Sequence, residues 1–171
     1  MIRADREVKD RDEILDIIRR CDVVRLAIHD EPFPYVVPVN FGFREEEGDI
    51  VLYLHGAKVG KTMELLARNP NVGFEMDCGH EMDDKPEIGE CSMDYESIIG
   101  AGTIEFLPEE AKLEALELLL AHYHEDAFPF NHKMIPATNV MRLRAVQCTG
   151  KRRKMRRPTD HMAGAPRQKE E

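Results

Sequence analysis

The stretch Tyr53–Pro70, YLHGAKVGKTMELLARNP, decides between two kinds of fold. Its segment Gly56–Thr62 is close to G-x-x-x-x-G-K-[ST], the loop whose amide groups surround nucleotide phosphates on a parallel βαβ sheet. Only three residues separate the two glycines here, and a loop that is one residue shorter points its amide groups elsewhere. The strict motif therefore fails. What remains is a strand, a glycine turn and Lys61-Thr62 at a helix start, which is still a suitable place for an anionic phosphate.

The segments on either side of this stretch predict hairpins. Strand-like runs are followed by turns or by other strands, and helices interrupt them only rarely. The sequence predicts strands at 23–29, 35–43, 50–55, 71–77, 95–107 and 139–151, and helices at 10–21, 60–68 and 108–126. This order excludes a regular parallel βαβ sheet and favours a mainly β fold: an antiparallel Greek-key-type β-barrel with flanking helices.

Several local features refine this prediction. Asp10 or Asp12 can cap the first helix. Pro38 cannot donate a hydrogen bond to a neighbouring strand, so it predicts a sheet edge or a bulge. The glycine pair near residue 100 permits a sharp bend in a long strand. The segment 78–94 has no clear apolar period and is predicted to be a long loop.

Length and composition are those of a soluble globular protein. The chain has 171 residues, 42% hydrophobic and 33% charged, which suits one domain at 1–154 and a basic, flexible tail at 155–171. No apolar run approaches the roughly 20 residues of a membrane span, and the charged N-terminus lacks the apolar core of a secretory signal. We therefore expect a cytoplasmic protein that does not bind a membrane.

Charge is divided unevenly along the chain. The net charge is −9, but residues 151–171 carry +5, which leaves −14 on residues 1–150. An acidic body argues against a nucleic-acid-binding surface. The basic segment KRRKMRR, residues 151–157, is expected either to be solvated or to lie on an acidic surface of its own subunit or a partner subunit.

The cysteines and histidines do not predict a metal centre. Cys21, Cys78, Cys91 and Cys148 form no C-x-x-C pair and are expected to be free thiols. Suitable metal-ligand chemistry is present at Cys78, His80 and Cys91, with His122 or His124 as further candidates. The spacing of these residues matches no standard metal site. The sequence therefore predicts no metal.

Four segments together resemble the pyridoxamine 5′-phosphate oxidase-like flavoproteins, and in particular the subgroup related to 5-nitroimidazole resistance proteins. They are RLAIHDEPFPYVVPVNFGF (25–43), LYLHGAKVGKTMELLARNPNVGFEMD (52–77), YESIIGAGTIEF (95–106) and TGK (149–151). The resemblance implies the FMN-binding split barrel. It also implies that the turn at 56–62 holds the phosphate of FMN, not that of ATP.

The resemblance implies flavin contacts in three places. The second strand supplies Pro38, Val39 and Asn40, and the strand after the 78–94 segment supplies Ser97, with Glu96 on its opposite face. The third strand and the turn after it supply four contacts: His55, Gly56, Lys61 and Thr62. Lys58 is a further base that could contact the phosphate. Arg142 is also included, although Arg142-Leu143-Arg144 lacks the histidine of the oxidase's Arg-Leu-His substrate motif.

The expected function is that of an FMN-dependent oxidoreductase, a homodimer with the flavin at the subunit seam. Nitroaromatic compounds of the 5-nitroimidazole type are the implied substrate class, and NAD(P)H would bind only transiently as donor. No residue presents itself as a catalytic acid, base or nucleophile. The alternatives are a non-catalytic flavin- or haem-binding protein on the same barrel, and an enzyme that uses a deazaflavin. The tail is expected to be dispensable for flavin binding.

Overall fold

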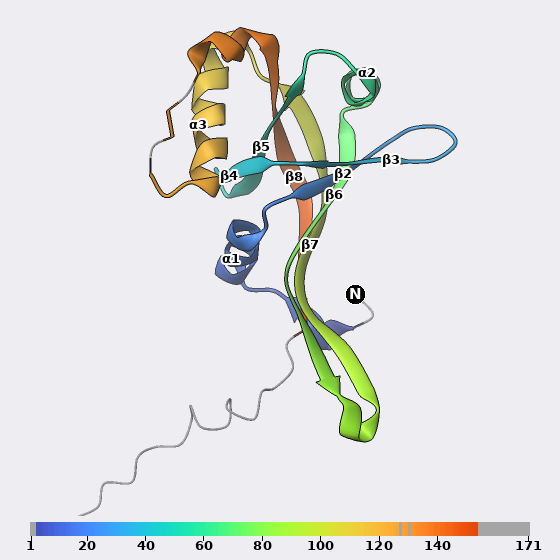
Figure 1. Cartoon of the computed structure of the whole chain (residues 1–171). Helices are drawn as coiled ribbons and strands as arrows, with labels where there is room; N and C mark the ends of the chain where they lie inside the picture. The colour runs from blue at the N-terminus through green and yellow to red at the C-terminus, as the bar shows by residue number, and fades with distance from the viewer. Residues whose placement is uncertain (1–2, 127, 130, 154–171) are drawn as a thin grey trace, which may run out of the picture.

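The computed structural model describes residues 3–126, 128–129 and 131–153. The predicted tail, residues 155–171, therefore lies outside the described residues. Figure 1 shows a barrel with helices packed against it and a long hairpin that extends away from it. None of the described helices is long and apolar enough to cross a membrane.

The described strands form one antiparallel sheet whose path runs β3-β2-β6-β7-β8-β5-β4, with β1 paired to β8. The end strands β3 and β4 are separated only by Asn40, so the chain itself joins the two ends of the sheet. This confirms the mainly β, split-barrel prediction. The strands are β1 (Glu7–Val8), β2 (Val24–Ile28), β3 (Tyr35–Val39), β4 (Phe41–Glu46), β5 (Asp49–Ala57), β6 (Asn71–Lys85), β7 (Glu90–Phe106) and β8 (Thr138–Arg153).

Three α-helices lie in the described parts of the chain: α1 (Arg11–Arg20), α2 (Lys61–Arg68) and α3 (Lys112–Tyr123). Short 3₁₀ turns at Ala4–Arg6, Pro86–Ile88, Glu109–Ala111 and His132–Ala137 complete the regular structure. Asp10 caps α1 as predicted, because its carboxylate accepts a hydrogen bond from the Glu13 amide at 3.0 Å. The third helix is shorter than predicted, since a 3₁₀ turn precedes it and it ends at Tyr123.

The barrel core is formed by strands in which buried and outward-facing residues alternate. In β2, Val24, Leu26 and Ile28 are buried while Arg25 and Ala27 face outward. The same alternation in the other strands, together with α1, produces a continuous cluster of buried side chains, among them Ile17, Ile18, Phe41, Leu52, Leu54, Phe74, Met76, Ile98, Met141 and Leu143. The core therefore holds the strand ends around residues 54–57 in fixed positions.

Helix α3 covers β4 and β5 at very close range. A Cβ atom added to Gly42 would lie 2.4 Å from the backbone oxygen of Leu118, so only glycine allows this approach. The Tyr123 hydroxyl donates to the Asp22 carbonyl at 2.8 Å and accepts from the Phe41 amide at 2.9 Å. The helix thereby fixes the junction between β3 and β4.

That junction corrects one prediction. Residues 35–43 are not a single strand, because the chain changes partner at Asn40: β3 pairs with β2, whereas β4 pairs with β5. Composition could not show this, since both halves are apolar and β-branched or aromatic. Pro38 does lie on the sheet-end strand β3, as predicted. The predicted hairpin turn is also present, with positive φ at Glu47 and Gly48.

The segment 78–94 is not a loop, and that prediction was wrong. After an irregularity between Cys78 and Glu81, residues 81–85 pair with residues 90–94 around a short turn. We call residues 81–94 the β6–β7 arm. No apolar alternation marks it because the arm projects beyond the barrel and neither of its faces packs on the core (Figure 1). The predicted bend near residue 100 is confirmed as a register shift between Ala101 and Gly102.

Candidate cofactor site

A pocket of about 230 Å³ opens where β5 leads into α2. Its floor is apolar and comes from the barrel core, whereas its rim is the turn that was singled out in the sequence. The floor residues are Leu26, Val37, Val39, Leu54, Met63 and Met141, and the rim residues are His55, Gly56, Ala57, Val59, Gly60, Lys61 and Thr62. An apolar floor with a few polar groups at one edge is typical of a small-molecule site.

The backbone of the rim is held by local chemistry. Gly60 has φ of 127°, a region that residues with a Cβ atom rarely adopt, and it immediately precedes α2. No side chain caps this helix start, so its first amide groups are left for solvent or a ligand. From β8, the Asn139 side-chain amide donates to the carbonyls of Ala57 and Lys58, each at 3.3 Å. The turn is therefore anchored on both sides.

Lys61 has a partner that sequence reasoning missed. Its Nζ lies 2.7 Å from Asp30 Oδ2 and 4.9 Å from the centre of the Tyr35 ring. The hydrogen bond from Lys61 lowers the pKa of Asp30. Because the Lys61 side chain is 56% exposed, the ion pair is weak and an anionic ligand can compete for the ammonium group. No local signal links residues 30 and 61, which only the packing of α2 beside β2 brings together.

His55 occupies the rim at the end of the buried run of β5. Desolvation by the surrounding protein lowers the pKa of His55, although the residue is partly accessible to solvent. The imidazole is therefore mostly neutral at pH 7, with one nitrogen able to donate and the other able to accept a hydrogen bond.

The structure separates the predicted second-strand residues. Val39 lines the pocket, but Pro38 is exposed on the opposite side of β3. Asn40 lies at the β3–β4 junction, where its amide is 3.5 Å from the Asp22 carbonyl. Lys58 is exposed on the turn and does not line the pocket. The rim residues His55, Gly56, Lys61 and Thr62 do come together.

Ser97 and Glu96 do not line the pocket of their own chain. Ser97 lies on β7, where it pairs with Asp77 of β6 and with Lys151 of β8. Glu96 is only 4% exposed and binds Arg20 at 2.5 Å and also Arg152. Burial alone would raise the pKa of Glu96, but hydrogen bonds from the two arginines outweigh burial and lower it. Glu96 therefore ties α1 to β7 and β8.

Arg142 also faces away from the pocket. It lies next to Met141, whose side chain points inward, so Arg142 points outward and binds Glu105 through Nη2 at 2.7 Å. Its other neighbour is Glu46, which accepts hydrogen bonds from Tyr53 and Arg44. Arg142 is part of a surface network of charges and does not contact the pocket of its own chain.

The described residues contain no group of three or more His, Cys, Asp or Glu side chains placed to hold a metal ion. Cys78 is buried beneath α1, with Sγ 3.4 Å from Arg20, whereas Cys91 is exposed on the arm. His122 instead contacts the Cys21 carbonyl at 2.7 Å and packs against Phe41.

The barrel, the strand–turn–helix rim and the apolar pocket place the protein among the split-barrel proteins. Residues 10–152 match the family model described as pyridoxamine 5′-phosphate oxidase, and the chain belongs to this family. A candidate 5-nitroimidazole antibiotic resistance protein from Bacteroides thetaiotaomicron is 33% identical, with 85% of each chain covered and a TM-score of 0.73. No curated protein sequence matches the chain.

Two more distant structures share the fold. The FAD and haem binding protein of Mycobacterium smegmatis is 20% identical, with coverage of 94% of this chain and 80% of that one and a TM-score of 0.73. The flavocytochrome Anf3 of Azotobacter vinelandii is 19% identical, with coverage of 93% and 76% and a TM-score of 0.69. At these identities the likeness is one of fold, and it extends over nearly the whole chain.

Proposed function

We propose that this protein is an FMN-dependent oxidoreductase that works as a homodimer and reduces small molecules, with nitroaromatic compounds of the 5-nitroimidazole type as the leading substrate class. The observation that carries the proposal is the pocket whose rim combines Lys61, Thr62 and the uncapped start of α2 over an apolar floor. The family match and the similarity to a candidate 5-nitroimidazole resistance protein support it.

The rim has the chemistry of a phosphate site. Lys61 offers a positive charge, Thr62 a hydroxyl donor and α2 its first amide groups. These residues would hold the FMN phosphate, and Val39, His55 and Gly56 would contact the rest of the cofactor. When bound, FMN supplies the redox chemistry, while the protein provides orientation and polarity. His55, mostly neutral, is positioned to exchange a hydrogen bond with a polar group of the ligand.

The size of the pocket favours a homodimer. Ligand pockets usually measure about 300–1,000 Å³, and this one has only about 230 Å³. It is therefore too small to enclose a whole flavin nucleotide, and a second surface is needed to cover the remainder. In the proposed dimer, the partner subunit supplies that surface, and Ser97 of one copy reaches the pocket of the other.

The outer face of the sheet supports such an assembly. Val36, Ile99 and Val146 are exposed by 56%, 57% and 73%, a grouping that is unusual on a surface facing only water. Between them run the small residues Ala27, Gly73 and Ala101, which are cross-strand neighbours on β2, β6 and β7. Small side chains make this part of the sheet flat, so a second copy can approach closely.

The visible absorption spectrum of the purified protein is the first test. FMN gives two broad bands in the blue and near ultraviolet, and anaerobic addition of NADH or NADPH should bleach them. Nitroaromatic oxidants should then restore the colour. A protein that stays colourless after incubation with FMN, or whose flavin no donor reduces, would contradict the proposal.

A second candidate function is non-catalytic binding of flavin or haem. The neutral imidazole of His55 at the pocket rim favours it, because haem iron needs an axial nitrogen or sulfur ligand. Two proteins of the same fold, described as an FAD and haem binding protein and as a flavocytochrome, support this candidate. A single intense Soret band in place of the two flavin bands would favour this candidate.

A further inference from the structure

The β6–β7 arm has an open edge close to where the described chain ends. On the barrel, β7 is paired on both sides, with β6 and with β8. The last β8 pair is Tyr95↔Arg153, and within the described residues no strand pairs with Glu90–Met93 on the side away from β6. A hairpin of only two strands is marginally stable in water, and an open strand edge is a template for another strand.

The register of β8 fixes which residues could continue the ladder. From Ala101↔Gln147 to Tyr95↔Arg153 the pairing has no irregularity. Continued by four residues, it sets Lys154 opposite Asp94, Met155 opposite Met93, Arg156 opposite Ser92 and Arg157 opposite Cys91. The next residue, Pro158, lacks an amide hydrogen and would end the strand.

The side chains on the arm match this continuation. Met82 is opposite Met93 across the arm, and these side chains are 52% and 39% exposed, so Met155 would extend an existing apolar row. Asp83 is opposite Ser92, and its Oδ2 is shielded from water without a hydrogen-bond partner among the described residues, with Lys85 Nζ only at 3.9 Å. Arg156 would fall in this row and could satisfy that oxygen.

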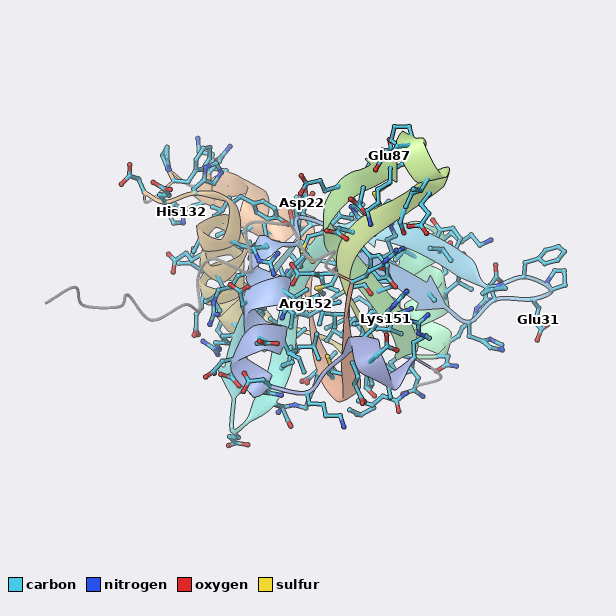
Figure 2. The ribbon with its side chains drawn as sticks, turned by 90° about the horizontal axis from the view of Figure 1, so that it is seen from below. Asp22, Glu31, Glu87, His132, Lys151 and Arg152 are labelled. Atoms are coloured by element: carbon cyan, nitrogen blue, oxygen red, sulfur yellow. The ribbon has the colours of Figure 1, made fainter. Side chains whose placement is uncertain are left out.

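Charge also favours the continuation of β8 along the arm. Residues 81–94 carry six acidic side chains and one basic one, whereas residues 154–157 carry three basic ones and no acid. Figure 2 shows Glu87 at the tip of the arm, away from the barrel, so the acidic surface is presented to solvent. A basic strand would both pair with the open edge and reduce the repulsion between the acids.

We infer that the β6–β7 arm is a docking surface for the chain's own segment Lys154–Arg157, which adds to the open edge of β7 as a third strand in register with β8. This interaction surface is independent of flavin chemistry. It gives the basic segment a structural partner in place of the passive role expected from its composition.

Disulfide trapping tests the register directly, because Cys91 is already exposed on the arm. Cross-strand Cα atoms about 4.5–5.5 Å apart fall within the range that a disulfide requires. In Arg157→Cys, oxidised glutathione should join the introduced thiol to Cys91: the two thiols lose two protons and two electrons, and one glutathione disulfide becomes two glutathiones. Arg156→Cys, whose side chain points to the other face, is the matched control and should react about tenfold more slowly.

The product distinguishes the possible occupants. A cross-link within one chain, seen as a monomer on a denaturing gel and lost with Cys91→Ser, supports the inference. A covalent dimer would overturn it and assign the edge to the tail of a second copy, and equal reaction of Arg157→Cys and Arg156→Cys would also overturn it.

Amide hydrogen exchange gives an independent measurement without any new cysteine. A chain ending at Arg153 should exchange the amides of residues 90–94 about tenfold faster than the full chain, because the edge loses its partner strand. Exchange in the barrel strands should not change, which serves as the internal control. Identical exchange of the arm in the two chains would contradict the inference.

Discussion

Replacing Lys61 by alanine should weaken the binding of FMN and leave the binding of riboflavin almost unchanged. The two ligands differ only by the phosphate, and Lys61 is the cation on the pocket rim at the start of α2. Thr62 and the first amides of α2 remain in the variant, so the phosphate site should be weakened and not abolished.

The structure sets the expected size of this effect. A hydrogen bond to a charged group contributes about 1.5–3 kcal/mol. Lys61 is 56% exposed and must first release Asp30, both of which favour the lower end of that range. We therefore expect a loss of about 1.5 kcal/mol, or roughly tenfold in Kd. Asp30→Asn should have the opposite effect, since it removes the anion that competes with the phosphate.

Titration of flavin fluorescence in parallel with FMN and riboflavin measures both constants. Lys58→Ala is the matched control, because Lys58 has the same charge, is three residues away and lies outside the pocket lining. Equal losses of FMN and riboflavin affinity in Lys61→Ala would refute the reasoning, as would a larger FMN-specific loss in Lys58→Ala.

Three further predictions concern stability and assembly. Glu96→Gln should destabilise the protein at neutral pH by about 3 kcal/mol in chemical denaturation, because Arg20 and Arg152 lose a buried carboxylate. The pKa of Glu96 is lower in the folded state, so this stabilisation is present above the ordinary pKa of 4.5 and is lost as pH falls through the folded-state pKa. A difference in stability between wild type and variant that does not shrink in acid would contradict this prediction. Gly42→Ala should lower the free energy of unfolding by about 3 kcal/mol, because the added methyl group would clash with the backbone of α3. A methyl group added in the control variant Gly73→Ala meets no atom closer than 3.7 Å and should change the free energy of unfolding little. Similar losses in both variants would disprove the packing argument. Ile99→Asp should shift the protein towards monomer in light scattering, because Ile99 is exposed on the proposed dimer face. A wild-type monomer that holds one FMN per chain would rule out a flavin site between two subunits.

Local sequence determined the fold class and the pocket rim. The hairpin order of the strands and the one-residue deficit between Gly56 and Gly60 excluded a parallel nucleotide-binding sheet. The same turn also identified Lys61 and Thr62, which do line a pocket. These features depend on residues close together in the chain, and so the spacing of a few side chains is enough to predict them.

Long-range pairing determined the rest. The sequence could not predict that Asp30 binds Lys61, that Arg142 points away from the pocket, or that Ser97 does not line the pocket of its own chain. Nor did it predict the β6–β7 arm, because a hairpin in solvent has no buried face and so no apolar period. The sequence thus predicted most of the barrel strands and the residues of the pocket rim. Only the tertiary structure, through strand register and the packing of α2 beside β2, decided which side chains meet there, because register depends on all the pairings of the barrel at once.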